Sequence, residues 1–437
     1  MHEKPFSVVE DYGFTFMFKI NLLQFEKVSH PTSKNDVISV CDIEKKKLQL
    51  ILRSINKISL TTDIWKSKVQ KISYMSDTGH FVDSNWELQK RVLSFMLLPP
   101  PHAGVDNFDG LMKCTKDWGI EHKIFTISVD NASNNDVAIQ IAKETFSTSR
   151  MLPLAGKLFH VRCIAHILNL VVQYGLYTIK YIIEDVKDSV RFINQSESRL
   201  MKFSDIGHHL GIPVKKLIID RPTRWNSTYE ILEDWNKVED VIAILEVFYD
   251  VTHVISGTEY PTSNVFLAVI WRVKYVLDEK ENHPSEFIKA MIKKMKQKFD
   301  KYWGDCNILM AIGAILDPRF KMRLVDFAFN KIYNEFDART NVKKVRDALY
   351  DMFFEYVQVD RMKTQKDSSS MSDKDIPIST VASEATFSAG TLVLDPYLAK
   401  LSFDMDQVLI CGADWLCHLH GIKKPIMTYE EEEQINV

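Results

Sequence analysis

Three acidic residues stand in distinctive short settings far apart in the chain: Asp63 within residues 59–65, Asp130 within 127–134 and Glu384 within 382–390. The first two end hydrophobic, strand-like runs. Three carboxylates that folding brings together can hold two hard cations, and two cations can drive phosphodiester chemistry. The sequence therefore predicts a candidate DNA-cutting site, or the descendant of one.

Each acid also has a structural interpretation. Asp130, followed by Asn131 and Ala132, is typical of a helix N-cap, and Glu384 is typical of a first-turn acid that the helix dipole favours. Taken singly, these residues fit structural roles better than catalytic ones. Only the three together indicate a metal-dependent site.

Hydrophobic periodicity indicates the elements that must position these acids. Alternation over residues 58–65 puts Ile58 and Leu60 on one face and Asp63 on the other, which predicts a strand. Further strands are expected at 72–82, 88–98, 123–129 and 158–162, and helices at 105–118, 132–146 and 164–176. This order is that of a ribonuclease-H-like mixed sheet flanked by helices. In that sheet the first strand lies beside the fourth, so Asp63 and Asp130 are expected to face one another.

The fold class is therefore α/β plus all-α. We predict, in chain order, an N-terminal helical segment, the ribonuclease-H-like core, a helical insertion, a flexible polar linker, a C-terminal helical region that carries the third acid, and an acidic tail. The boundaries are 1–56, 57–176, 177–362, 363–375, 376–420 and 421–437.

Composition limits the class of protein. The chain has 437 residues, 46% of them hydrophobic, which is enough for two or three domains with real cores. The formal net charge of −3 argues against a dedicated basic DNA-binding module. Residues 155–225 nevertheless hold eleven Lys and Arg against six Asp and Glu. This basic segment is either a nucleic-acid contact or an ordinary soluble surface.

The six cysteines are scattered, and none forms a Cys-x-x-Cys pair. No zinc site is therefore predicted, and free thiols fit a reducing compartment. No apolar run approaches the roughly 20 residues of a membrane span, and no signal peptide opens the chain. We expect a soluble intracellular protein with no membrane partner.

Several long segments, among them 59–65, 118–136, 159–172, 222–229 and 316–321, resemble plant hAT-superfamily transposases of the RICESLEEPER-like zinc finger BED group. The resemblance covers about residues 57 to 420. It implies a ribonuclease-H-like core, a helical insertion and a C-terminal dimerisation region at 376–420. It also implies that Asp63, Asp130 and Glu384 form the metal-binding, catalytic triad, with Mg²⁺ or Mn²⁺ as cofactor in an active protein.

The same resemblance implies a DNA-binding set. Cys163 and His166 match a Cys-x-x-His motif of the family, and Arg224 with Trp225 match its Arg-Trp motif. Arg162 joins His166, Arg224 and Trp225 as a predicted DNA contact. The residues themselves allow this, because a Trp can stack on an extruded base while an Arg holds a phosphate. Core packing of Cys163, His166 and the Trp is the alternative.

A dimer surface is expected in the C-terminal region, where apolar residues either meet a partner or form an ordinary core. These residues are Phe387, Leu394, Leu409 and Trp415. The partner would be a second copy or a related hAT-type protein.

Three departures from the family affect the predicted function. No BED finger is found, the insertion is short between residues 229 and 246, and the polar linker replaces a helical stretch before residue 376. We therefore predict a nuclear, transposase-derived nucleic-acid-binding protein that is not autonomously active. The alternatives are a metal-dependent DNA transposase that uses the Asp/Asp/Glu triad, and a protein-interaction module.

Overall fold

The computed structural model of the chain describes residues 6–22, 25–67, 71–149, 152–209, 239–257, 262–303, 307–364 and 403–419. The chain divides into two compact units. Unit 1 comprises Met1–Val161, Ser370–Pro377 and Ala382–Val437, and unit 2 comprises Arg162–Ser369 and Ile378–Val381.

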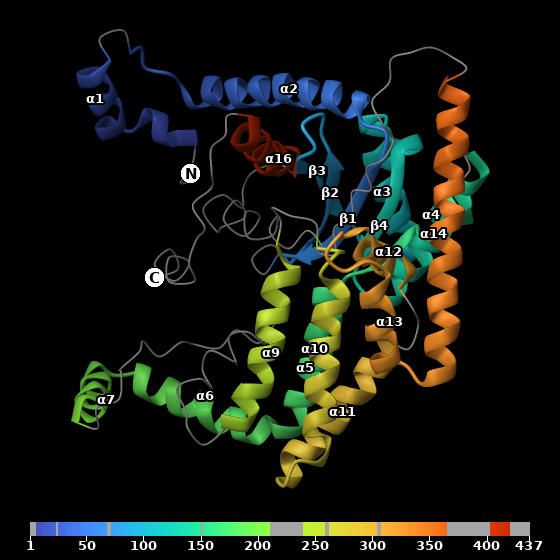
Figure 1. Cartoon of the computed structure of the whole chain (residues 1–437). Helices are drawn as coiled ribbons and strands as arrows, with labels where there is room; N and C mark the ends of the chain where they lie inside the picture. The colour runs from blue at the N-terminus through green and yellow to red at the C-terminus, as the bar shows by residue number, and fades with distance from the viewer. Residues whose placement is uncertain are drawn as a thin grey trace. The chain divides into compact units, whose positions relative to one another are not determined.

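Unit 1 is built on a five-stranded mixed sheet with the strand order β3-β2-β1-β4-β5 (Figure 1). The strands are β1 (Ile58–Lys66), β2 (Ser73–Val82), β3 (Leu88–Leu98), β4 (Ile124–Val129) and β5 (His160–Arg162). β2 pairs antiparallel with both β1 and β3, whereas β1 pairs parallel with β4. β1, β2 and β3 thus form an antiparallel meander, and the predicted pairing of the first and fourth strands is confirmed.

The helices of unit 1 begin and end at residues that the sequence marks. Ser29 caps α2 through its side chain, which accepts a hydrogen bond from the Thr32 N–H. Gly119 ends α3 in the left-handed conformation, with φ 65°, where a glycine costs least. The helical elements are η1 (Phe6–Glu10), α1 (Tyr12–Asn21), α2 (His30–Ser54), α3 (Gly104–Trp118), η2 (Glu121–Lys123), α4 (Ser133–Ser149), η3 (Pro153–Gly156) and α16 (Phe403–Leu419).

The core of unit 1 lies between the sheet and these helices. α3 packs on α4 and contacts β2 and β3, and α16 contacts β3 and α2. Large buried side chains from several elements meet there, including Tyr74, Phe81, Phe95, Phe146 and Phe159. Burial of this apolar surface holds the central strands rigid, so the strand ends are firm supports for side chains.

Unit 2 is helical in its described part, as predicted for residues 177–360. Its elements are α5 (Ile164–Leu176), η4 (Tyr177–Ile179), α6 (Lys180–Asn194), α7 (Glu197–His209), α9 (Glu239–Ile255), α10 (Phe266–Glu279), η6 (Lys280–Asn282), α11 (Glu286–Trp303), α12 (Ile308–Leu316), α13 (Lys321–Ile332) and α14 (Glu335–Thr364). The apolar α5 packs against α9 and α11. Among the described residues, no helix combines the length and the apolar composition that crossing a bilayer requires.

Candidate functional site

The fold brings two of the predicted site residues to one edge of the sheet. β1 and β4 run parallel, and their register pairs Thr61 with Ser128. Continued two residues beyond this last recorded pair, the register brings Asp63 level with Asp130, which directly follows β4. Asp63 thus lies inside β1, three residues before that strand ends at Lys66, whereas Asp130 directly follows the last residue of β4.

Asp130 is oriented by a chain of hydrogen bonds. Its Oδ1 accepts from the N–H of Ala132, at 2.9 Å, and from Nδ2 of Asn135 in α4. Asn135 Oδ1 in turn accepts from Nδ2 of Asn107 in α3, at 2.8 Å, and both asparagines are buried. The bond to the Ala132 N–H closes an Asx turn before α4, which begins at Ser133, so Asp130 is not the N-cap of that helix but its carboxylate is held in place.

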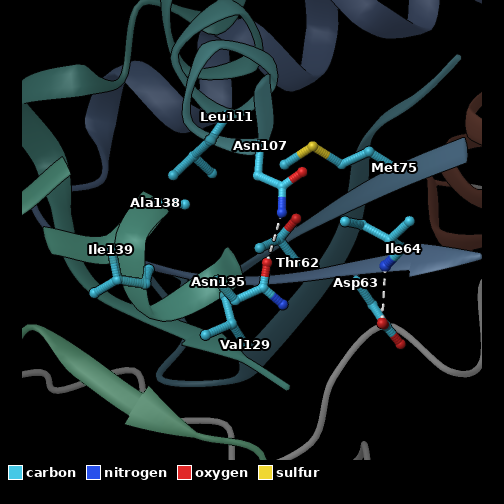
Figure 2. Close-up of a pocket in the computed structure, with 10 residues that line it drawn as sticks. All are labelled: Thr62, Asp63, Ile64, Met75, Asn107, Leu111, Val129, Asn135, Ala138 and Ile139. Carbon is cyan, nitrogen blue, oxygen red and sulfur yellow. Dashed lines mark hydrogen bonds between the residues drawn. The ribbon is translucent and has the colours of Figure 1, made fainter. Parts of the chain in front are cut away.

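Asp63 borders a small cavity under this edge (Figure 2). Its Oδ1 accepts from the N–H of the neighbouring Ile64, at 2.8 Å. The cavity volume is about 10 Å³, room for about one water molecule. It is lined by Thr62, Asp63, Ile64, Met75, Asn107, Leu111, Val129, Asn135, Ala138 and Ile139. The side-chain oxygen of Asn107 is buried without a hydrogen-bond partner, so this polar network has one unused acceptor.

The chemistry of this edge fits part of a divalent-cation site. Asp63 and Asp130 offer carboxylate oxygens, which Mg²⁺ and Mn²⁺ prefer as ligands. Within the described residues, no group of three or more His, Cys, Asp or Glu is arranged to hold a metal ion. The third predicted ligand, Glu384, lies outside the described residues.

Buried polar groups continue from this edge into the sheet. Thr62 Oγ1 donates to Asp77 Oδ1 at 2.6 Å, and Thr61 Oγ1 lies 3.1 Å from His80 Nε2. Burial raises the pKa of Asp77 to about 6, against the hydrogen bond from Thr62. Burial also lowers the pKa of His80 to about 3. Both side chains of β2 are therefore stabilised in their neutral forms.

Family descriptions match four successive parts of the chain. Residues 61–158 match the "ZBED1 RNase-like domain", and residues 161–264 match the "ZBED1 RNase-like helical domain". Residues 264–356 match "hAT-like transposase, RNase-H fold", and residues 375–416 match "hAT family C-terminal dimerisation region". The chain belongs to the hAT transposase-like family. The predicted ribonuclease-H-like fold and C-terminal dimerisation region are confirmed.

Curated relatives agree with this assignment. The hAT chain is 34% identical to zinc finger BED domain-containing protein RICESLEEPER 2 of Oryza sativa subsp. japonica over 82% of its own length and 53% of the relative's. It is 32% identical to RICESLEEPER 1 of the same organism, over 92% of the chain and 60% of the relative. It is 29% identical to a putative AC transposase of Zea mays, over 95% of the chain and 64% of the relative. The chain thus spans little more than half the length of the first two relatives.

The hAT chain's predicted DNA contacts are only partly described. Arg162 ends β5 and is half-buried, and His166 is half-buried in the first turn of α5. Cys163 precedes α5 and is buried, as in the core-packing alternative. Arg224 and Trp225 lie outside the described residues.

Of the four predicted dimer residues, two lie within the described residues and two lie outside them. Trp415 is 3% exposed and lies in the core of its own unit, and Leu409 is partly buried against that core. Phe387 and Leu394 lie outside the described residues. The apolar face of α16 is thus used, at Trp415, within the chain itself.

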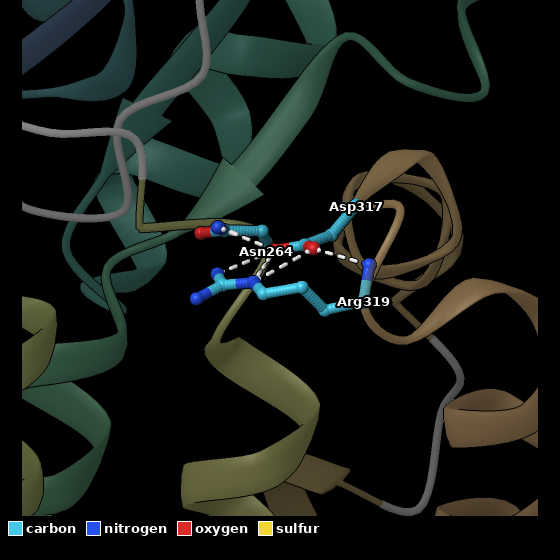
Figure 3. A network of polar contacts seen from close by, with 3 residues as sticks. All are labelled: Asn264, Asp317 and Arg319. Atoms are coloured by element: carbon cyan, nitrogen blue, oxygen red, sulfur yellow. Dashed lines mark hydrogen bonds and ion pairs between the residues drawn. The ribbon is translucent and has the colours of Figure 1, made fainter.

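A second polar network lies in the helical unit (Figure 3). Asp317, between α12 and α13, accepts hydrogen bonds from Arg319 Nη2 at 2.7 Å, from the Arg319 N–H at 2.9 Å and from Asn264 Nδ2 at 3.0 Å. These bonds, those from Arg319 foremost, hold the pKa of Asp317 well below its usual range. The arrangement fixes the connection between the two helices.

Sequence reasoning missed the two buried asparagines, Asn107 and Asn135. Asn135 stands five residues after Asp130, within reach across the turn before α4, and this spacing was the available signal. Asn107 gave none, because its contact depends on how α3 packs on α4.

Proposed function

We propose that this protein binds DNA and carries, at Asp63 and Asp130, the aspartate part of a divalent-metal site for strand cleavage. The observation that supports this is the parallel pairing of β1 with β4, whose register, continued by two residues, brings Asp63 level with Asp130. The hAT family match also supports a role in strand cleavage, because transposases cleave DNA strands.

The roles of the residues follow from their contacts. Asp63 and Asp130 would hold the cation, and Glu384 is proposed as the third ligand. Asn135 and Asn107 keep the Asp130 carboxylate in one orientation. A bound Mg²⁺ or Mn²⁺ supplies Lewis acidity and a water of lowered pKa. Without it, two adjacent carboxylates repel each other, so cation binding is expected to stabilise this edge.

Nicking of supercoiled plasmid DNA by the full chain tests the proposal. We expect conversion to nicked circles that requires Mg²⁺ or Mn²⁺ and is lost in Asp63→Asn and in Asp130→Asn. Asp109→Asn is the matched control, because Asp109 is an exposed aspartate of α3 in the same unit. Nicking that persists equally in all three variants would refute the assignment.

A second candidate is DNA binding without autonomous cleavage. It is supported by the basic balance of residues 155–225, which hold eleven Lys and Arg against six Asp and Glu. It predicts salt-sensitive DNA binding, with no nicking at any divalent-ion concentration. Affinity for DNA that does not change with salt would contradict both candidates.

Self-association and a nuclear location complete the proposal. The match of residues 375–416 to the hAT dimerisation region supports a homodimer or a pair with a related protein. Light scattering of the purified chain measures the first, and a fluorescent fusion in plant cells measures the location. A strictly monomeric mass at high concentration would remove the homodimer.

A further inference from the structure

One flank of α11 carries lysines that no described carboxylate neutralises. On the other flank, Lys296 lies within ion-pair distance of Asp278 and Glu281, at 2.9 Å from Asp278 Oδ1. Lys294 and Lys298 have no ion pair with any described carboxylate. Their ammonium groups lie instead over the ring of Tyr174 in α5, at 5.6 and 4.6 Å from its centroid.

This geometry fixes two positive charges side by side. Lys294 and Lys298 are four residues apart, so they project from the same side of α11. A cation over an aromatic face is attracted by the ring without losing its charge. Tyr174 is 39% exposed, Lys294 is exposed and Lys298 is half-buried, so the ring and the lysine pair are open to solvent. Tyr174 therefore acts as a positioning residue for the two lysines.

The surroundings strengthen the positive potential. From Arg162 to Ile183 the sequence contains no acidic residue, and this stretch includes all of α5 and η4. η4 contacts α11 and presents Tyr177, which is 75% exposed. The carboxylates of α11 itself, Glu286 and Asp300, lie about 80° or more around the helix from Lys294 and Lys298 at 100° per residue. Lysines interleaved with exposed rings are typical of nucleic-acid surfaces.

The predicted DNA contact His166 is half-buried on the same helix, about 80° around α5 from Tyr174 at 100° per residue. His166 and Tyr174 are eight residues apart, about 12 Å along a helix at 1.5 Å per residue. Along a duplex axis that separation spans about seven phosphates, at about 1.7 Å of axis per charge. A backbone that touches His166 can therefore continue over Tyr174.

We infer that Tyr174, Lys294 and Lys298, which we name the α5–α11 patch, form a contact surface for the phosphate backbone of DNA. The inference rests on the proposed DNA binding and adds a site to it. The patch contacts phosphates and reads no sequence, so it contributes affinity that falls with salt.

The test measures binding of the full chain to a fluorescent 20-base-pair duplex, and to a single strand of the same length, across a salt series. The variant is Lys294→Gln with Lys298→Gln. The matched control is Lys289→Gln with Lys293→Gln, which removes the same charge from lysines of the same spacing about 140° around α11 at 100° per residue. Circular dichroism melting checks that both variants are folded.

We expect the patch variant to bind at least about fivefold more weakly than the control variant. A plot of log K against log salt has a negative slope, and we expect this slope to be shallower in the patch variant than in the wild type. The difference should be about 1.8 for the duplex or about 1.4 for the single strand, because two phosphate contacts are lost at 0.9 or 0.7 each. The arm with the larger loss identifies the form of DNA that the patch contacts. Equal affinities and slopes in the two variants would overturn the patch alone, whereas absence of binding by the wild type would overturn the proposed DNA binding with it.

Substitution of the ring gives an independent readout. Tyr174→Phe keeps the aromatic face and is expected to bind as the wild type does. Tyr174→Leu removes the face that positions both lysines, and we expect about twofold to fivefold weaker binding with an unchanged salt slope, because the charges remain. Identical binding by the Phe and Leu variants would show that the ring has no positioning role and would overturn that part of the inference.

Discussion

Trp415 of α16 donates its indole N–H to the main-chain carbonyl oxygen of Val92 in β3, at 2.7 Å. The neighbouring Asp414 accepts from the N–H of Val92 at 2.9 Å, so one turn of α16 satisfies both main-chain groups of that residue. β3 is an edge strand of the sheet, and Val92 lies at the point where the register between β2 and β3 shifts. An uncovered edge would offer unpaired main-chain groups to other chains. The helix from the dimerisation region therefore closes the sheet of its own unit.

Removal of the Trp415 side chain is expected to destabilise the chain severely. The indole is buried and packs edge-on against Trp118 at 5.5 Å between ring centroids. Trp415→Ala should lower the free energy of unfolding by about 3–5 kcal/mol, as for other buried aromatic truncations. Trp415→Phe keeps most of the packing but leaves the Val92 carbonyl unpaired, for about 1–3 kcal/mol. Urea unfolding measures both.

Phe354→Ala is the control for Trp415, because Phe354 is 57% exposed on α14. Its stability should change by about 0.5 kcal/mol or less. A Trp415→Ala loss no larger than that of the control would mean that α16 is not part of the folded core in solution.

The pH dependence of stability should change when Asp77 is replaced. Its pKa is raised from 3.8 to about 6, so the folded chain holds this proton more tightly than the unfolded chain. The stabilisation is therefore complete below about pH 4 and is lost as pH rises through about 6, with a span of about 3 kcal/mol. Asp77→Asn removes that term and should be more stable than the wild type at pH 8, while the difference vanishes near pH 4.

His80 acts in the opposite direction and must be kept in the comparison. Its pKa is lowered from 6.5 to about 3, so the stability that comes from its neutral ring is lost as pH falls below about 6.5. Thermal melting of Asp77→Asn and the wild type at pH 4, 6 and 8 isolates the Asp77 contribution, because His80 is common to both. Parallel stability curves for the two proteins would contradict the raised pKa.

The sheet could be predicted because its strands are short apolar runs bounded by polar turns, although β2 and β4 are buried on both faces rather than on alternate residues. The order of elements then put Asp63 and Asp130 on neighbouring strands, and the parallel register of β1 and β4 agrees with that expectation. The left-handed end of α3 at Gly119 was equally visible, since glycine favours that conformation.

The partners of polar side chains could not be predicted in the same way. Asn107 meets Asn135 only because α3 and α4 pack together, and periodicity identifies the buried face of a helix but not the atom that it meets. The apolar residues of α16 had the same ambiguity. A face of this kind can pack on its own chain or on a second copy, and Trp415 packs on its own chain. The predictions for Glu384, Phe387, Leu394, Arg224 and Trp225 stay predictions.

Asn135→Leu should weaken both stability and any metal-dependent nicking. The change keeps the approximate size of the side chain but removes the donor to Asp130 and the acceptor for Asn107. A buried donor left without a partner costs about 1–3 kcal/mol, which urea unfolding measures. Nicking should fall further than stability explains, because the Asp130 carboxylate is no longer oriented. Asn134→Leu is the control: it removes only an exposed hydrogen bond to the His102 carbonyl, so stability should fall by about 1 kcal/mol or less and nicking should be retained.

Asp317 is expected to stabilise the connection between α12 and α13 through its charge. Its pKa is lowered, chiefly by Arg319, so the stabilisation is present above about pH 4, the unfolded value, and is lost as pH falls below it. Asp317→Asn should lower the melting temperature at pH 7 and reduce the fall in melting temperature as the solution is acidified. Arg319→Lys should have a smaller effect of the same kind, because lysine keeps the charge but cannot make the forked contact.

The control for Asp317 is Glu335→Gln, which breaks the exposed ion pair with Arg339 on α14. Both side chains of that pair are 78% exposed, so solvent screens them and little change in melting temperature is expected. The contrast separates a carboxylate held by several hydrogen bonds from one held by a single solvated contact. If Asp317→Asn and Glu335→Gln melt at the same temperature at pH 7, the Asp317 network does not stabilise the helical unit. The helices would then position Asn264, Asp317 and Arg319, and the hydrogen bonds among these residues would not stabilise the helices.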